Sequence, residues 1–89
     1  MKSHITKSFG EGFRQLPEAV RRQGRQAYKL FKQNPYHPSL KFRQVHSIKP
    51  IYSVRIGIHY RAIGIRQRDE IIWYWIGSHA EYDRILSHL

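Results

Sequence analysis

Two apolar stretches in the second half of the chain constrain its fold more than any other feature. In "IYSVRIGIHY", residues 51–60, apolar or aromatic side chains occupy every second position and small or polar ones lie between them. This period of two is typical of a β-strand with one packed face and one face open to solvent or ligand. "IIWYWIG", residues 71–77, is apolar at consecutive positions, which favours a central strand. A sheet is therefore the expected centre of the fold.

The segments around these stretches predict how the strands are connected. The alternation changes phase at Ile63 and Ile65, so we expect a bulge or tight turn within residues 57–60. "RQRDE", residues 66–70, has the polar composition of a hairpin turn. "LKFRQV", residues 40–45, alternates again and predicts a further half-buried strand. Together these patterns predict an antiparallel meander of three or four strands.

A helix is predicted before the meander, over residues 17–33. Proline suits the first turn of a helix, and Glu18 beside it favours the positive end of the helix dipole. Apolar side chains recur at helical spacing, with lysines and arginines on the outer face. "NPYHP", residues 34–38, ends the helix because proline excludes helical conformation at and before its own position.

Both ends of the chain predict short elements. "SHITKSF", residues 3–9, alternates loosely and indicates a short edge strand, since the two glycines that follow break any long element there. At the other end we expect a short helix after residue 77, with Ser78 as its cap and Glu81 at the capping-box position. The expected class is α+β, with N-terminal helices packed on a small three- to four-stranded antiparallel sheet and a short C-terminal helix. We expect one domain, residues 1–89.

Charge defines the expected partners. Sixteen lysines and arginines against six acidic residues give a formal net charge of +10, which favours binding to phosphate backbones or to an acidic protein. The chain has no cysteine, no apolar run that would cross a membrane and no apolar leader segment at the N-terminus. We therefore expect a cytoplasmic protein without membrane contact.

Basic side chains alternate along two of the expected strands. Lys41 and Arg43 lie on one, and Arg55 and His59 on the other. Such a face is suited to charge-assisted contacts with phosphates, although a solvated strand face has the same pattern. The six histidines are too scattered to predict a metal centre, and no cofactor-binding motif is present, so we expect neither a metal nor a cofactor.

The residues at the end of the apolar stretch are candidates for chemistry. His79 directly follows the predicted strand, and an imidazole titrates at about pH 6.5, which suits proton transfer. A histidine that merely decorates the terminal helix is the alternative. Trp73 and Trp75 would stack on bases if exposed, but in so small a sheet we expect them in the core.

"YSVRIGIHYRAIGI" followed by "IIWYWIGSHAEYDRIL" resembles the RelE/ParE superfamily, the toxin components of bacterial type II toxin–antitoxin pairs. The resemblance extends from the helix at residues 17–33 through "NPYHPSLKFRQV" to the C-terminus, in the family's order of elements. RelE-like members are ribosome-dependent endoribonucleases that cleave mRNA without a metal, and an antitoxin that wraps the basic face neutralises them. ParE-like members share the fold and act on DNA gyrase.

The resemblance also implies roles for single residues. Arg61 matches the strand arginine that stabilises charge on the scissile phosphate, and Arg55 matches a basic residue that binds the RNA backbone. His79 and Tyr82 resemble a C-terminal pair that serves proton transfer or stacking. Residues 34–50 contain no acid where some relatives carry a glutamate base, so the general base stays open. His79 would act as acid or base, complemented by Tyr82 or His59.

Three functions remain open at this point, and Arg55, Arg61, His79 and the charge of +10 favour the first of them. The first is a RelE-like toxin that cleaves mRNA on the ribosome and thereby inhibits translation. The second is a non-catalytic ParE-like toxin that binds gyrase, for which His79 would be dispensable. The third is a basic nucleic-acid-binding domain without chemistry, whose affinity would depend on salt. Fold alone does not choose among them.

Overall fold

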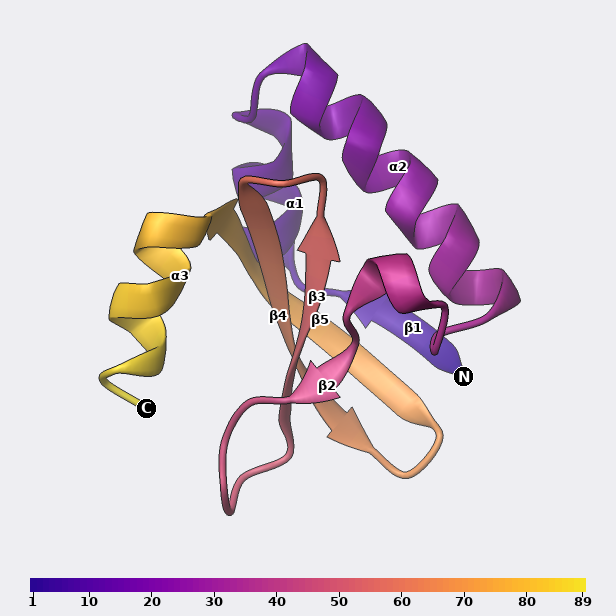
Figure 1. Cartoon of the computed structure of the whole chain (residues 1–89), viewed down its shortest axis with the longest axis vertical. Coiled ribbons are helices and arrows are strands. Elements are labelled where there is room, and N and C mark those ends of the chain that lie inside the picture. The colour runs from indigo at the N-terminus through magenta and orange to yellow at the C-terminus, as the bar shows by residue number, and fades with distance from the viewer.

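The computed structural model covers residues 1–89 and is built around a five-stranded sheet in the order β1-β5-β4-β3-β2 (Figure 1). The strands are β1 (Lys2–Ile5), β2 (Arg43–Gln44), β3 (Ile51–Ile56), β4 (Tyr60–Gln67) and β5 (Glu70–Ser78). Strands β2 to β5 pair in antiparallel fashion, as predicted, whereas β1 pairs in parallel with β5. The α+β class is confirmed, and the parallel strand makes the sheet larger than the expected three or four strands.

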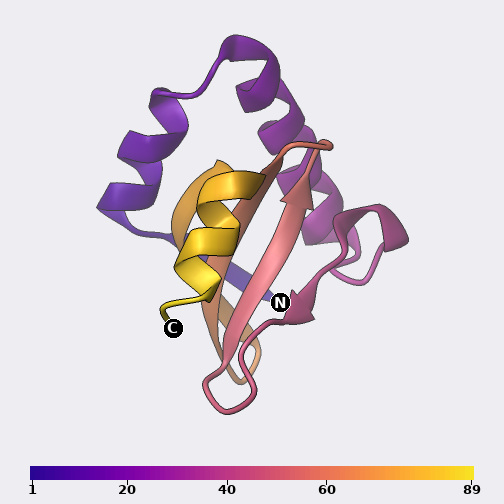
Figure 2. The same cartoon turned by 60° about the vertical axis from the view of Figure 1, so that its left-hand side comes forward.

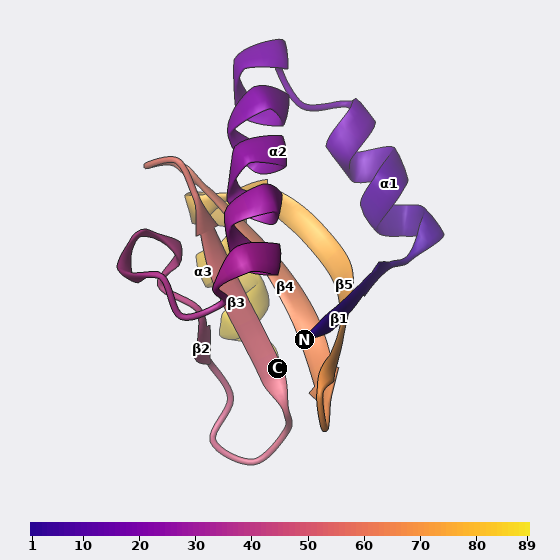
Figure 3. The ribbon, with the colours of Figure 1, turned by 90° about the vertical axis from the view of Figure 1, so that its right-hand side faces the viewer.

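Three helices cover the sheet, two on one face and one on the other (Figure 3). They are α1 (Lys7–Arg14), α2 (Glu18–Gln33) and α3 (His79–Leu86). The predicted helix over residues 17–33 is confirmed as α2. The predicted capping box of α3 is also present, because Ser78 accepts from the backbone of Glu81 and the Glu81 carboxylate accepts from the backbone of Ser78.

Helix α1 contradicts the expectation that two glycines prevent a long element after the first strand. Gly10 and Gly12 lie inside this helix. Each glycine costs about 1 kcal/mol relative to alanine in a helix interior. Two features offset that cost: Thr6 caps the helix by accepting from the Phe9 amide at 3.1 Å, and Phe9 and Phe13 pack against the core.

The strand predicted over residues 51–60 is two elements joined by a tight turn. Strand β3 ends at Ile56, and Gly57 has a φ of 60°, a conformation that glycine adopts without strain. The phase change therefore comes from a turn, as expected, and Ile58 is exposed instead of packed. The hairpin predicted at residues 66–70 is confirmed between β4 and β5.

The strand predicted over residues 40–45 is shorter than expected. Leu40 ends a turn of 3₁₀ helix, Pro38–Leu40, and Lys41 follows it in the left-handed conformation with a φ of 50°. Only the two residues of β2 then pair with β3. The alternation of this segment reflects burial of Leu40 and Phe42 rather than a continuous strand.

A β-bulge explains why residues 71–77 are apolar on both faces. Ile63 of β4 pairs with Trp75 and Gly64 pairs with Trp73, so Tyr74 has no partner across the ladder. The bulge turns Trp73 toward α1 and α2, whereas Trp75 packs on the side of α3. Trp73 is 3% exposed and confirms the core interpretation, and Trp75 is half-buried.

The sheet separates two apolar cores. The larger core lies under α1 and α2, where Phe31 meets Trp73 edge to face with the ring centroids 5.5 Å apart. The smaller core lies under α3 and contains Ile51, Ile63 and Tyr82. Alternate residues of β3 and β4 therefore serve different layers, and polar residues on the α3 side are placed by a rigid strand.

Candidate functional site

A hollow lined by basic side chains lies on the α3 side of the sheet. We call it the basic hollow; it has a volume of about 520 Å³ and opens to solvent. Its lining residues come from the segment around β2, from β3 and β4, and from α3: Lys41, Phe42, Arg43, Ser53, Arg55, Arg61, His79, Tyr82 and Asp83. Every residue that the sequence proposed for chemistry or RNA binding is among them except His59.

Two arginines of neighbouring strands line the basic hollow. Arg55 of β3 lies directly opposite Arg61 of β4 in the antiparallel register. The Arg55 Nε donates to the Gly57 carbonyl at 2.9 Å, and the Arg61 Nη1 donates to the Tyr60 carbonyl at 2.9 Å. Partial burial, and then repulsion from Arg55, lower the pKa of Arg61 from its ordinary value. Like charges placed opposite each other destabilise a sheet, and a bound anion would relieve that repulsion.

The start of α3 holds His79 in the lining of the basic hollow. Its backbone amide donates to the carbonyl of His59 at 2.7 Å, and the capping box fixes the first turn of the helix. The imidazole Nδ1 lies 3.1 Å from Oδ2 of Asp83, one helical turn further on. Its ring meets that of Tyr82 edge to face at 5.8 Å. The His79 side chain is 47% exposed, so a substrate can reach it.

Tyr82 lies at the wall of the basic hollow, with its ring inside the protein. The residue is only 4% exposed, and its hydroxyl donates to Oγ of Ser53 at 3.0 Å. A ring buried to this extent cannot stack on an RNA base. Of the two roles that the resemblance implied for Tyr82, only proton transfer through the hydroxyl remains compatible with this burial.

His59 does not share a strand with Arg55, as the sequence had suggested. Strand β3 ends three residues earlier, and His59 lies in the exposed turn before β4. Its backbone supports His79, but its side chain does not line the basic hollow. The period-two pattern predicted the wrong location because it continued through the turn at Gly57.

The basic hollow also contains two polar residues that were not predicted from the sequence. Asp83 is the only acid that lines it, and Ser53 is the buried partner of Tyr82. The spacing of four residues between His79 and Asp83 was visible, since such residues meet on a helix. Nothing local in the sequence linked Ser53 with Tyr82, because they come together only when α3 packs on the sheet.

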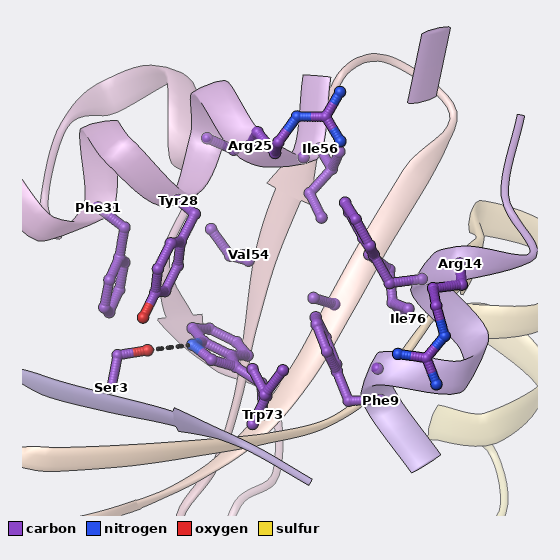
Figure 4. A pocket seen from close by; sticks show the side chains of 16 residues that line it. Ser3, Phe9, Arg14, Arg25, Tyr28, Phe31, Val54, Ile56, Trp73 and Ile76 are labelled. Atoms are coloured by element: carbon purple, nitrogen blue, oxygen red, sulfur yellow. Dashed lines mark hydrogen bonds between the residues drawn. The ribbon is translucent and has the colours of Figure 1, made fainter. Parts of the chain in front are cut away.

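An apolar groove lies on the opposite side of the sheet, between α1 and α2 (Figure 4). We call it the apolar groove; its volume is about 440 Å³, and Arg14 and Arg25 are its only charged lining residues. Phe9, Tyr28, Phe31, Trp73 and Ile76 are among the larger side chains that line it. Gly24 lets the helices approach here, since an added Cβ would lie 2.9 Å from Cε1 of Phe13. The groove was not foreseen because the sequence pattern located α2 but not α1.

No three side chains of histidine, aspartate or glutamate lie together in an arrangement that would hold a metal ion. None of the helices combines the length and the apolar character that crossing a membrane requires.

Several solved structures share this fold. A chain of the RelB–RelE antitoxin–toxin complex from Methanococcus jannaschii aligns with a TM-score of 0.72 and 17% identity, over 91% of this chain and 96% of that chain. YafQ from E. coli aligns with a TM-score of 0.72 and 12% identity over the same shares. The YoeB/ParE toxin from Agrobacterium tumefaciens gives 0.68 and 16%, over 89% of this chain and 99% of that chain. At these identities the likeness concerns the fold alone.

Comparison by sequence identifies the family. None of the curated proteins matches the chain. The family model described as the ParE-like toxin domain matches residues 18–84, from the first residue of α2 to within α3. This span includes the whole lining of the basic hollow. The resemblance drawn from the sequence is thereby confirmed, and the chain belongs to the ParE-like toxin family.

Proposed function

We propose that this protein is the toxin of a type II toxin–antitoxin pair and that it inhibits translation by cleaving mRNA on the ribosome, in the cytoplasm. The observation that carries the proposal is the basic hollow. It gathers two arginines and a histidine from three different elements around a space of the size of a phosphate and its neighbouring sugars. A toxin that acted only by binding a protein would not need these three groups to converge.

The convergent groups supply what RNA cleavage requires. The ribose 2′-oxygen loses a proton and attacks the adjacent phosphorus, and the 5′-oxygen then leaves and takes up a proton, which gives a 2′,3′-cyclic phosphate and a 5′-hydroxyl. Arg61 and Arg55 offset the charge that builds on the pentacoordinate phosphate. His79 transfers one proton, and the Tyr82 hydroxyl is the remaining candidate for the other, since the side chain of His59 does not line the basic hollow. Lys41 and Arg43 hold the flanking backbone. In this scheme no step depends on a metal ion or cofactor.

Replacing Arg61 with alanine tests the nuclease directly. Loss of one donor that stabilises transition-state charge typically lowers turnover by about 10²- to 10³-fold. We expect expression of the parent chain to arrest growth and to produce codon-phased cuts in primer extension on cellular mRNA, and Arg61→Ala to abolish both. Lys29→Ala is the control, because it removes one positive charge from the exposed face of α2, away from the basic hollow.

The same measurement separates the other two functions. Intact mRNA together with DNA damage signalling would support a toxin that acts on gyrase instead of a nuclease. Intact mRNA without growth arrest would support a nucleic-acid-binding domain without catalysis. Undiminished cutting by folded Arg61→Ala and His79→Ala variants would show that the basic hollow is not the active site.

We further propose that an antitoxin neutralises the protein and that one of its helices occupies the apolar groove. Two complexes from other organisms with this fold are described as RelB–RelE and RelE–RelB complexes, so the fold accommodates an antitoxin. The apolar groove offers aromatic side chains for an apolar stripe, and Arg14 and Arg25 favour acidic residues beside that stripe. The partner is thus an amphipathic helix with an acidic flank.

A charge reversal at the groove tests this docking. Arg25→Glu places an acid beside the expected acidic flank, and we expect it to weaken binding at least tenfold. Titration calorimetry would use the protein encoded by the neighbouring gene, with Arg61→Ala as the background so that cells survive expression. Lys29→Glu is the matched control, since it reverses a charge one turn further along α2 but outside the groove. Equal weakening by both reversals, or by neither, would contradict docking in the groove.

A further inference from the structure

The acid in the basic hollow requires an explanation. Asp83 is the only acidic residue among the nine that line it, and the hollow is proposed to bind a polyanion. A carboxylate next to phosphates weakens their binding through like-charge repulsion. The Asp83 side chain is 63% exposed and takes no part in a packed core. An exposed carboxylate of this kind adds little to the stability of the fold, so stability does not explain its presence in the hollow.

The contact of Asp83 with His79 supplies the explanation. Oδ2 lies 3.1 Å from Nδ1 of the imidazole, within hydrogen-bonding distance. A carboxylate only accepts hydrogen bonds, so Nδ1 must carry the proton in this contact. Nε2 is then the ring nitrogen that is left to exchange a proton with a substrate.

The surroundings of His79 leave Asp83 as its only acidic partner in the hollow. The charged groups that line the hollow from β3 and β4 are Arg55 and Arg61, and those from the segment around β2 are Lys41 and Arg43. On α3 itself the neighbour is the ring of Tyr82, whose hydroxyl is bonded to Ser53. The carboxylate of Glu81 is engaged in the capping box.

From this arrangement we propose that Asp83 is a positioning residue for the nuclease reaction. It orients the imidazole of His79 and selects the tautomer that has a free Nε2, and that nitrogen takes the proton from the 2′-hydroxyl. The proposal rests on the proposed function and deepens it, because it names the base that the sequence left open. His79 is the catalytic residue, and Asp83 acts through it.

Removing the carboxylate should affect binding and catalysis in opposite directions. In Asp83→Ala the hollow loses its only negative charge, so RNA should bind equally well or more tightly. The imidazole loses its orientation, and the cleavage step should slow by about tenfold, part of the 10²- to 10⁴-fold that a positioned acid or base contributes. Replacing a residue that only stabilised the fold would not change RNA affinity and the cleavage rate in different ways.

The experiment measures single-turnover cleavage of end-labelled mRNA on programmed ribosomes, together with toxin affinity for the same ribosomes. We expect Asp83→Ala to cleave about tenfold more slowly with undiminished affinity, and Asp83→Glu to recover part of the rate. Asp69→Asn is the control, since it removes one negative charge from the exposed turn between β4 and β5. Cleavage by Asp83→Ala within twofold of the parent rate would overturn the proposal.

Nitrogen-15 spectra of the histidine rings provide a readout that does not depend on activity. The His79 ring of the parent chain should show Nδ1 protonated in its neutral form, and Asp83→Ala should shift the tautomer equilibrium toward protonated Nε2. An unchanged His79 spectrum would overturn the proposal even if cleavage slowed. If the parent chain cleaves no RNA, the proposed function fails, and the spectra still decide whether Asp83 selects the tautomer.

Discussion

A buried hydrogen bond joins β3 to α3 at the basic hollow. The Tyr82 hydroxyl donates to Oγ of Ser53 at 3.0 Å, and the two residues are 4% and 3% exposed. Because both residues are buried, each hydroxyl relies mainly on the other for a hydrogen bond. Tyr82 therefore contributes to the stability of the site as well as to the chemistry proposed for it.

The energetic asymmetry of buried hydrogen bonds predicts how this pair responds to substitution. Tyr82→Phe leaves the Ser53 hydroxyl unpaired, and Ser53→Ala does the same to Tyr82, so each should lower the free energy of unfolding by about 1–3 kcal/mol. The double variant removes both polar groups and should cost less than the sum of the two. Urea denaturation of the four proteins measures this coupling. Strictly additive costs would show that the contact contributes nothing.

Elements with strong local periodicity and recognisable caps were predictable from the sequence. Helix α2 combines an apolar stripe, an acidic first turn and a proline at its start, and its predicted extent differs from the observed one by a single residue. Helix α3 was predictable because its capping box is read from two residues three positions apart. The hairpin between β4 and β5 follows from a short polar interruption between apolar strands.

Elements that depend on contacts between distant segments were not predictable in the same way. The parallel pairing of β1 with β5 joins residues about 70 positions apart, and the Trp73 Nε1 hydrogen bond to Ser3 Oγ that supports it has no local pattern. Helix α1 forms despite the low helix propensity of its glycines, because its phenylalanines pack against the larger core. The bulge at Tyr74 likewise follows from the pairing of β4 with β5.

The candidate site shows the same division between local and distant information. The residues that the resemblance named on β4 and α3, Arg61, His79 and Tyr82, do line one hollow. His59 was misplaced because a period-two pattern does not reveal where a strand ends. Asp83 and Ser53 were missed because their importance lies in what they contact, at 3.1 Å and 3.0 Å, and not in a motif.

The two surfaces of the protein lie on opposite faces of one thin sheet. Val54 and Ile56 of β3 line the apolar groove, and Ser53 and Arg55, which alternate with them, line the basic hollow. The helices follow the same division, with α3 on one side of the sheet and α1 and α2 on the other (Figure 2). A helix seated in the groove would therefore leave the hollow open. An antitoxin that blocks catalysis must pass around an edge of the sheet, which requires an extended segment in addition to its docked helix.

The charge of the whole molecule, concentrated in part at the basic hollow, predicts a salt-dependent affinity for RNA. For single strands the logarithm of the binding constant falls with the logarithm of the salt concentration, with a slope of about −0.7 for each phosphate that a protein cation neutralises. Four cations line the hollow, Lys41, Arg43, Arg55 and Arg61. If each neutralises one phosphate, the slope should be about −3.

Fluorescence anisotropy with a 2′-O-methyl RNA, which resists cleavage, measures this slope. We expect Arg55→Gln to make the slope less steep by about 0.7 and Lys29→Gln, on the outer face of α2, to leave it unchanged. Equal changes in both variants would assign RNA binding to the general surface charge, because the hollow would then hold no more phosphates than the rest of the molecule.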